Sequence, residues 1–256
     1  MCIVSFHFAQ HPKYKLIVAA NRDEFYRRPT KGAHFWEDEP YILAGRDLEA
    51  KGTWLGITKE GRFAALTNFR DPKYFDRTDK RSRGEIVTNF LKSKDTPLAY
   101  LEKLHAKSNQ YNGFNILLGT PDELYYYGNE EKEIKKIKAG THSLSNALLN
   151  SPWPKVIRAK RLLKEYVTKT ERVDPNILFQ QLHDQTKAPD HALPNTGVGL
   201  TLERDLSPIF IRTDDYGTRC STVILVTKDN KVEFFERTFN DGEFKEERAF
   251  QFNISE

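Results

Sequence analysis

At 256 residues, with 38% apolar and 30% charged residues spread along its length, the chain has the composition of a globular protein and not of a disordered one. Its net charge is only +4, with lysine and arginine intermixed with acidic residues, which excludes the basic stripe of a nucleic-acid-binding surface. No apolar run approaches the ~20 residues that cross a bilayer, so we expect no membrane span.

The first part of the chain alternates apolar and polar residues with the period of β-strands. This alternation covers residues 2–8, 15–20, 41–45, 54–58 and 62–68. The turn signals "QHPK" and "KEGR" separate some of these segments. The sequence therefore predicts an antiparallel sheet that begins near the N-terminus.

Two helices are predicted next. Residues 82–93 place Ser82 and Glu85 at the spacing of a capping box. Residues 95–108 have Pro97 in the first turn and leucines on one face. We expect these segments to cover one face of a sheet.

The same succession of strands and helices then repeats. Strand patterns cover 114–120, 123–128 and 132–146, helical patterns cover 152–169 and 174–185, and the closing strand patterns cover 208–212, 219–227, 231–239 and 244–252. The polar segment 185–199 is expected to be a functional or mobile loop, because loops of this length are uncommon otherwise.

The order of these elements indicates the fold class. It contains no alternation of single strands and helices and no glycine-rich phosphate loop, which argues against a doubly wound nucleotide-binding fold. We expect an α+β protein with two antiparallel sheets, each covered by helices, and one domain over residues 1–256.

The cysteines and the first residues indicate the compartment. Only Cys2 and Cys220 are present, too few for a disulfide framework, and no Cys/His spacing is typical of a zinc site. The start "MCIVSFHFAQHPKYK" lacks the basic stretch and the cleavage site of a signal peptide. We expect a cytoplasmic protein without a metal or another cofactor.

The first two strands are expected to form a hairpin that turns around His11, Pro12 and Lys13. Cys2 then faces Arg22, with Cβ atoms ~5 Å apart. A slip of one residue would turn the apolar residues of the first strand to the other face, so the pattern supports this register. The other pairs on the same face are Val4 with Ala20, Phe6 with Val18 and Phe8 with Leu16.

A cysteine at position 2 has a special chemical option. Removal of Met1 leaves Cys2 with a thiol and a free α-amino group of pKa ~8, which can act as the base of that thiol. Arg22 would favour the thiolate, and Asp23 could accept a hydrogen bond from the α-ammonium. The alternative is that Cys2 is a small apolar side chain and that Arg22 and Asp23 pair with each other.

Several spaced segments resemble a known family. They are "NRDEF", "AGRDLEAKGTWLGI", "AALTNFRDP", "SRGEIV", "LSNALLNSPWPKV", "LPNTGVG" and "GTRCSTVILV". From residue 1 to about 226 the chain is similar to the NRDE family, also called the transport and Golgi organisation protein 2 family. The resemblance implies kinship with N-terminal-nucleophile hydrolases, a four-layer αββα sandwich, and a parallel to cysteine amidases that cleave bile-salt and penicillin V amides.

Carried over by position, the resemblance implies Cys2 as nucleophile, with Arg22 and Asp23 as the charged pair beside it. The amidases space their arginine and aspartate differently from the adjacent pair here. Cys220 stands where we expect serine in the family.

The resemblance also implies two oxyanion residues and a second cation. Asn68 would lie near the oxyanion, Asn146 would donate a hydrogen bond to it, and Arg219 would be a further cation at the same site. Each has a structural alternative: asparagines commonly cap strands and turns, and Arg219 could pair with Asp214 or Asp215.

These observations lead to two hypotheses of function. The first is an N-terminal-nucleophile-type hydrolase of a linear amide or related acyl bond, whose partner is a small acyl-type molecule. The second is a non-catalytic binding module for haem or for acyl-CoA or lipid-like ligands in intracellular haem or lipid homeostasis. No haem-attachment motif is present, although Cys2, a tyrosine or a histidine could ligate iron.

Overall fold

The computed structural model describes residues 2–74, 77 and 79–255. The strands within these residues are β1 (Cys2–Phe8), β2 (Tyr14–Phe25), β3 (Thr30–Phe35), β4 (Ile42–Asp47), β5 (Leu55–Thr58), β6 (Phe63–Asn68), β7 (Phe114–Thr120), β8 (Glu123–Gly128), β9 (Ile134–Lys136), β10 (Gly140–Leu144), β11 (Tyr216–Thr227), β12 (Lys231–Asn240) and β13 (Glu243–Asn253). The α-helices are α1 (Gly84–Lys92), α2 (Pro97–Ala106), α3 (Pro154–Val167), α4 (Pro175–Leu182) and α5 (Leu200–Asp205), and the short 3-10 helices are Pro72–Tyr74, Ser108–Gln110 and Asp190–Ala192.

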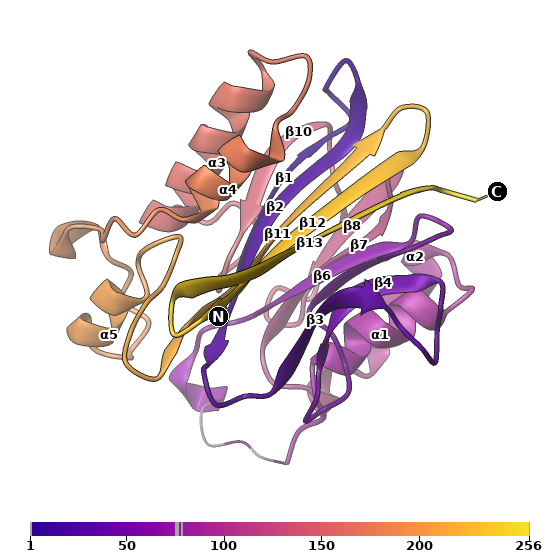
Figure 1. Cartoon of the computed structure of the whole chain (residues 1–256). Coiled ribbons are helices and arrows are strands. Elements are labelled where there is room, and N and C mark those ends of the chain that lie inside the picture. The colour runs from indigo at the N-terminus through magenta and orange to yellow at the C-terminus, as the bar shows by residue number, and fades with distance from the viewer. Residues whose placement is uncertain (1, 75–76, 78, 256) are drawn as a thin grey trace.

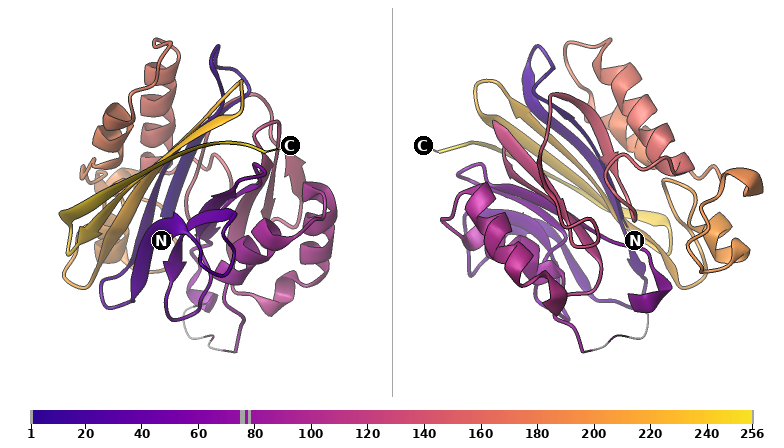
Figure 2. Two further views of the ribbon diagram at one scale, coloured as in Figure 1. Left: turned by 45° about the vertical axis from the view of Figure 1, so that its right-hand side comes forward. Right: turned by 180° about the vertical axis from the view of Figure 1, so that it is seen from behind.

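The strands form two antiparallel sheets that pack face to face (Figure 1). The first sheet has the order β10-β1-β2-β11-β12-β13, and the second has the order β3-β4-β5-β6-β7-β8-β9. Helices α3 and α4 cover the outer face of the first sheet, and α1 and α2 cover that of the second (Figures 1 and 2). The four-layer αββα sandwich expected from the sequence is thereby confirmed.

The hairpin of β1 and β2 has the predicted register. Cys2 pairs with Arg22, and the apolar pairs that follow on the same face are those expected from the sequence. Because side chains alternate along a strand, Val4, Phe6 and Val18 enter the core between the sheets. Residues on the other face of the same strands, such as Ile17, pack under α3 and α4. Each strand of the hairpin is therefore buried on both faces.

Some predicted elements differ from the structure. Residues 208–212 do not form a strand, and Arg212 alone makes an isolated bridge to Gly217. This segment is apolar because Ile209, Phe210 and Ile211 are buried, and burial alone does not distinguish a strand from an extended loop.

Three further details were wrong or missing in the sequence-based prediction. The capping box is absent: Arg83 precedes α1 and its side chain makes no cap hydrogen bond. The strand β3 and the short helix α5 were not predicted, because "TKGAHF" alternates weakly and α5 has only 6 residues. The predicted strand segment 132–146 is divided between β9 in the second sheet and β10 in the first.

Candidate active site

Cys2, Arg22 and Cys220 lie in one row across the strands β1, β2 and β11. Arg22 is the register partner of Cys2 on one side and of Cys220 on the other. The guanidinium of Arg22 stacks on the Trp54 ring at 4.4 Å from the ring centroid. Its Nη2 lies 3.5 Å from Oδ2 of Asp47, which ends β4 in the second sheet. Arg22 therefore joins the two sheets beside Cys2.

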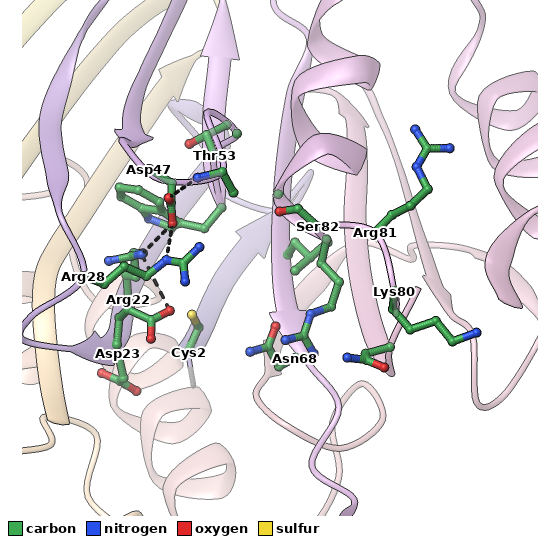
Figure 3. Close-up of a pocket in the computed structure, with 18 residues that line it drawn as sticks. Cys2, Arg22, Asp23, Arg28, Asp47, Thr53, Asn68, Lys80, Arg81 and Ser82 are labelled. Atoms are coloured by element: carbon green, nitrogen blue, oxygen red, sulfur yellow. Dashed lines mark hydrogen bonds and ion pairs between the residues drawn. The ribbon is translucent and has the colours of Figure 1, made fainter. Parts of the chain in front are cut away.

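A cavity of about 300 Å³ opens between the ends of the two sheets, and Cys2 lines it. Cys2 and Arg22 project into it from the first sheet, while Asn68 faces Cys2 from the second (Figure 3). The other lining residues are Asp23, Glu24, Arg28, Asp47, Ala50, Gly52, Thr53, Trp54, Leu66, Lys80, Arg81, Ser82, Arg83, Gly84 and Asn112. The cavity thus gathers most of the motif segments that are far apart in the sequence.

Asp23 stands on the opposite face of β2 from Arg22, because neighbouring side chains of a strand alternate. Its Oδ1 accepts a hydrogen bond of 2.7 Å from the Thr218 hydroxyl. Burial raises the pKa of the Asp23 carboxyl, while the nearby Lys155 ammonium, the Thr218 bond and Arg22 act in the opposite direction. The adjacent arginine and aspartate therefore serve different layers of the fold.

The ionisation of Cys2 differs from the expectation that Arg22 makes the thiol acidic. Burial raises the pKa of Cys2, and the negative charge of Asp23 raises it further. Arg22 and a hydrogen bond from the backbone of Asp23 lower this pKa but do not reverse the net direction. At this site desolvation outweighs the attraction of the neighbouring cation.

Asn146 and Asn68 are linked, but they occupy different positions. Asn146 is fully buried, and its Nδ2 donates a hydrogen bond of 2.9 Å to the carbonyl oxygen of Asn68. Its Oδ1 lies 3.1 Å from the Ser145 hydroxyl, which is also 2.9 Å from the carbonyl oxygen of Cys2. Of the two asparagines only Asn68 lines the cavity. The side-chain amide of Asn146 is thus directed at the backbone of Asn68. A direct oxyanion donor would be directed at the cavity.

Arg219 does not line the cavity beside Cys2. Its Nη1 donates to the carbonyl oxygens of Phe25, Tyr26 and Arg28 at 2.8 to 3.0 Å, so it holds the connection between β2 and β3. It lies instead beside a smaller cavity of about 70 Å³ that Cys220 also lines. The structure brings Cys2, Arg22, Asp23 and Asn68 together at one cavity and places Arg219 apart from them.

A cluster of buried charges behind Cys2 was not found from the sequence. Arg70 and Glu203 form an ion pair of 2.5 Å, with side chains only 3% and 4% exposed. Lys155, at the start of α3, is also buried, and its Nζ donates to the carbonyl oxygen of Leu206 at 3.1 Å. We name Asp23, Arg70, Lys155 and Glu203 the buried charge cluster, because Lys155 interacts electrostatically with the other three.

The buried charge cluster involves residues of the motif segments to which the sequence analysis assigned no role. Arg70 comes from "NFRDP" and stacks on Trp153 of "SPWPK" at 4.8 Å. Glu203 also accepts a 2.9 Å hydrogen bond from the backbone of Thr196 in "LPNTGVG". These segments are therefore tied to each other behind the cavity. A charged residue inside an otherwise apolar helix start, as in "PWPKVI", was the available signal.

Lys155 is expected to give the folding free energy a distinct pH dependence. Burial lowers the pKa of Lys155 from 10.5 to about 8, so between these values the unfolded chain binds more protons than the folded one. The free energy of unfolding contributed by this group therefore rises as pH increases from 8 to 10.5. At ~1.4 kcal/mol per pH unit the increment is about 3 kcal/mol.

Urea denaturation of the wild type and of Lys155→Met across this range measures that increment. We expect the difference in unfolding free energy between the two proteins to change by about 3 kcal/mol in the stated direction. Taking the difference cancels the titration of groups that do not interact with Lys155, such as Cys220. A difference that is constant across the range would contradict the lowered pKa.

Two general properties of the described residues bear on function. No group of three or more His, Cys, Asp or Glu side chains in this part of the chain is arranged to hold a metal ion. Among the helices that the structure describes, none has both the length and the apolar character needed to cross a bilayer.

Comparison with known sequences identifies similar proteins along the whole chain. The family model described as "Transport and Golgi organisation 2" matches residues 1–241. The "Transport and Golgi organization 2 homolog" of Mus musculus is 40% identical over 276 residues, with 99% of both chains covered. The human protein named "Transport and Golgi organization protein 2 homolog" is 39% identical, again over 99% of both chains.

Among the solved structures with a similar fold are two enzymes that are named as hydrolysing their substrates. A mutant of the conjugated bile acid hydrolase from Clostridium perfringens superposes with a TM-score of 0.53 at 10% identity, covering 100% of this chain and 98% of that one. The Caenorhabditis elegans ortholog of N-acylethanolamine-hydrolyzing acid amidase gives a TM-score of 0.51 at 11% identity, covering 88% and 92%. At such identities the similarity shows a common hydrolase-like fold.

Proposed function

We propose that this chain, which belongs to the Transport and Golgi organisation 2 family, hydrolyses a linear amide or related acyl bond through Cys2. Its N-terminal-nucleophile hydrolase-like fold supports the proposal. The observation that carries the proposal is the position of Cys2 on a cavity between Arg22 and Asn68. Cys2 thus lies beside a cation and an amide donor in one cavity.

The reaction requires that Met1 be removed, so that Cys2 carries a free α-amine. That amine takes the thiol proton, and the sulfur attacks the carbonyl carbon to form a tetrahedral intermediate. The C–N bond then breaks, the leaving amine takes the proton from the α-ammonium, and a thioester remains on Cys2. Water adds to the thioester with the α-amine as base, the C–S bond breaks, and the acid leaves as the thiol is restored.

The neighbouring residues have separate tasks in this proposal. Arg22 opposes the effect of burial on the Cys2 thiol and favours the thiolate. Asn68 is the side-chain donor to the oxyanion, because its amide faces Cys2 across the cavity (Figure 3). Asn146 acts through Asn68, whose backbone carbonyl oxygen accepts its hydrogen bond, and the role of Asp23 is to attract the α-ammonium.

Mass spectrometry of protein made without an N-terminal tag tests the proposal. The intact mass should show the loss of one methionine. Brief reaction with p-nitrophenyl decanoate should then add one decanoyl group, located on Cys2 by peptide mapping, with a burst of one p-nitrophenolate per chain. The matched control is Cys220→Ser, which should acylate normally because Cys220 is buried outside this cavity.

Retention of Met1, or acylation of residues other than Cys2, would contradict a hydrolase of this type. The alternative is a binding module for haem or acyl-CoA or lipid-like ligands. Two observations favour it: the amide of Asn146 is already committed to Asn68, and burial raises the pKa of Cys2. Stoichiometric haem binding that is lost with one tyrosine or histidine substitution and unaffected by Cys2→Ala would support the module.

The expected cellular setting and domain organisation also stay proposals. We place the protein in the cytoplasm, because it has only two cysteines and they are unpaired in the structure. We treat residues 1–256 as one domain, and a single cooperative unfolding transition by both fluorescence and circular dichroism is the expected result.

A further inference from the structure

The cavity beside Cys2 has more basic than acidic side chains among its described lining residues. The basic ones are Arg22, Arg28, Lys80, Arg81 and Arg83, and the acidic ones are Asp23, Glu24 and Asp47. A cavity with an excess of one sign attracts ligands of the other sign. Which of these cations is available to a ligand follows from their ion pairs.

The three carboxylates among the described lining residues already have partners within the protein. Oδ2 of Asp47 lies 2.5 Å from Nε of Arg28 and 3.5 Å from Nη2 of Arg22. Glu24 lies 3.7 Å from the same nitrogen of Arg22. Asp23 accepts a hydrogen bond from the Thr218 hydroxyl and, within the buried charge cluster, interacts with Lys155. These contacts balance Arg22 and Arg28 internally.

On the opposite side of the cavity, Lys80 and Arg81 also have carboxylate partners. Nε of Arg81 lies 2.6 Å from Oε1 of Glu85, and Nζ of Lys80 lies 3.7 Å from Asp79. Both side chains therefore have a counter-charge of their own near the outer surface. Lys80 and Arg81 therefore contribute less to the binding of an anionic ligand.

Arg83 differs from the other cations of the cavity. Its Nη1 donates one hydrogen bond of 3.1 Å to the carbonyl oxygen of Gly113, and no carboxylate among the described residues lies within ion-pair distance of its guanidinium. Burial lowers the pKa of Arg83, and the negative charges that oppose this effect include Glu24 and the Cys2 thiolate. A half-buried guanidinium that lines the cavity and has donors that no described carboxylate takes can bind an anion there.

The backbone around Arg83, like its guanidinium, favours a negatively charged ligand. Arg83 immediately precedes α1, a helix of 9 residues that has no side-chain cap, and Ser82, Arg83 and Gly84 all line the cavity. The first N–H groups of a helix and its dipole favour negative charge. The helix start and the guanidinium therefore act on the same part of the cavity, on the side of α1.

From these contacts we infer that the ligand of this cavity carries an anionic group, a carboxylate or a phosphate, which Arg83 and the start of α1 bind while its acyl carbonyl lies at Cys2. This inference rests on the proposed function for the position of the carbonyl. The binding of the anion itself does not depend on turnover.

Isothermal titration with the Cys2→Ala variant separates binding from chemistry. The carboxylate pair of probes is N-decanoylglycine and its neutral analogue N-decanoylglycinamide, and the phosphate pair is decyl phosphate and 1-decanol. We expect at least one charged probe to bind ~10-fold to 100-fold more tightly than its neutral analogue, as one charge-assisted contact provides. The pair that shows the larger ratio identifies the anion as carboxylate or phosphate.

Two matched variants in the Cys2→Ala background locate the contact. Arg83→Gln should remove most of the preference for the charged probe, and Arg83→Lys should restore part of it. Arg81→Gln removes the same charge from the same cavity, but it should change the preference less than ~3-fold, because Glu85 already balances Arg81.

Equal binding of charged and neutral probes in both pairs would overturn the inference. So would equal losses in Arg81→Gln and Arg83→Gln, because they would show a diffuse effect of net charge. A charge preference that depends on Arg83 in a protein that never acylates on Cys2 would retain the anion site and reject the hydrolase.

Discussion

Replacing Cys2 by alanine is expected to lower the steady-state hydrolysis of p-nitrophenyl decanoate by ~10⁴-fold or more, because removal of a covalent nucleophile typically has an effect of this size. The burst and the acyl adduct should disappear together. Cys2→Ser keeps the α-amine and a weaker nucleophile, so it should retain slow acylation. Melting temperatures of both variants should stay near that of the wild type, because Cys2 lies at a cavity and not in the packed core.

The chain offers a matched control in its second cysteine. Cys220 is buried, and burial together with the charge of Glu236 raises its pKa well above the ordinary value. Cys220→Ser should therefore leave hydrolysis unchanged. Hydrolysis that survives in Cys2→Ala, or that is lost in Cys220→Ser at an unchanged melting temperature, would contradict the assignment of Cys2 as nucleophile.

Arg70→Met is expected to lower the free energy of unfolding by about 3 to 5 kcal/mol, because it leaves the carboxylate of Glu203 buried without its main counter-charge. For a chain of this size the melting temperature should fall by about 10 °C. The loss should also loosen Thr196 and its loop, which Glu203 holds through the 2.9 Å bond from the Thr196 backbone. Urea denaturation and differential scanning calorimetry measure the two quantities.

An exposed ion pair on α3 provides the comparison. Arg161 and Glu165 lie 3.2 Å apart with side chains 57% and 51% exposed, so Arg161→Met should change the unfolding free energy by less than about 0.5 kcal/mol. The double variant Arg70→Met with Glu203→Met should recover much of the loss, because no buried charge then lacks a partner. Equal effects of Arg70→Met and Arg161→Met would show that the buried pair contributes no more than a surface pair.

The local features of this protein could be predicted from its amino-acid sequence. The alternation in β1 and β2 admitted one register, because any other would have placed apolar side chains on the wrong face, and the structure has that register from Cys2 to Phe8. Helical periodicity located α1 to α4 within a few residues of their ends. The order of these elements indicated two antiparallel sheets, each covered by helices, and the family resemblance implied the four-layer αββα sandwich.

Which polar residues share the cavity depends on the three-dimensional arrangement of the strands and could not be predicted from the sequence. Arg22 and Asp23 are neighbours in the chain but face different layers, and Asn146 donates to Asn68, which is distant in sequence. Arg83 and Lys155 are two of 40 lysines and arginines, and even the apolar setting of Lys155 in the sequence does not indicate which charges lie near it. Their significance comes from burial and from the charges around them, and a sequence pattern of one chain records neither of these quantities.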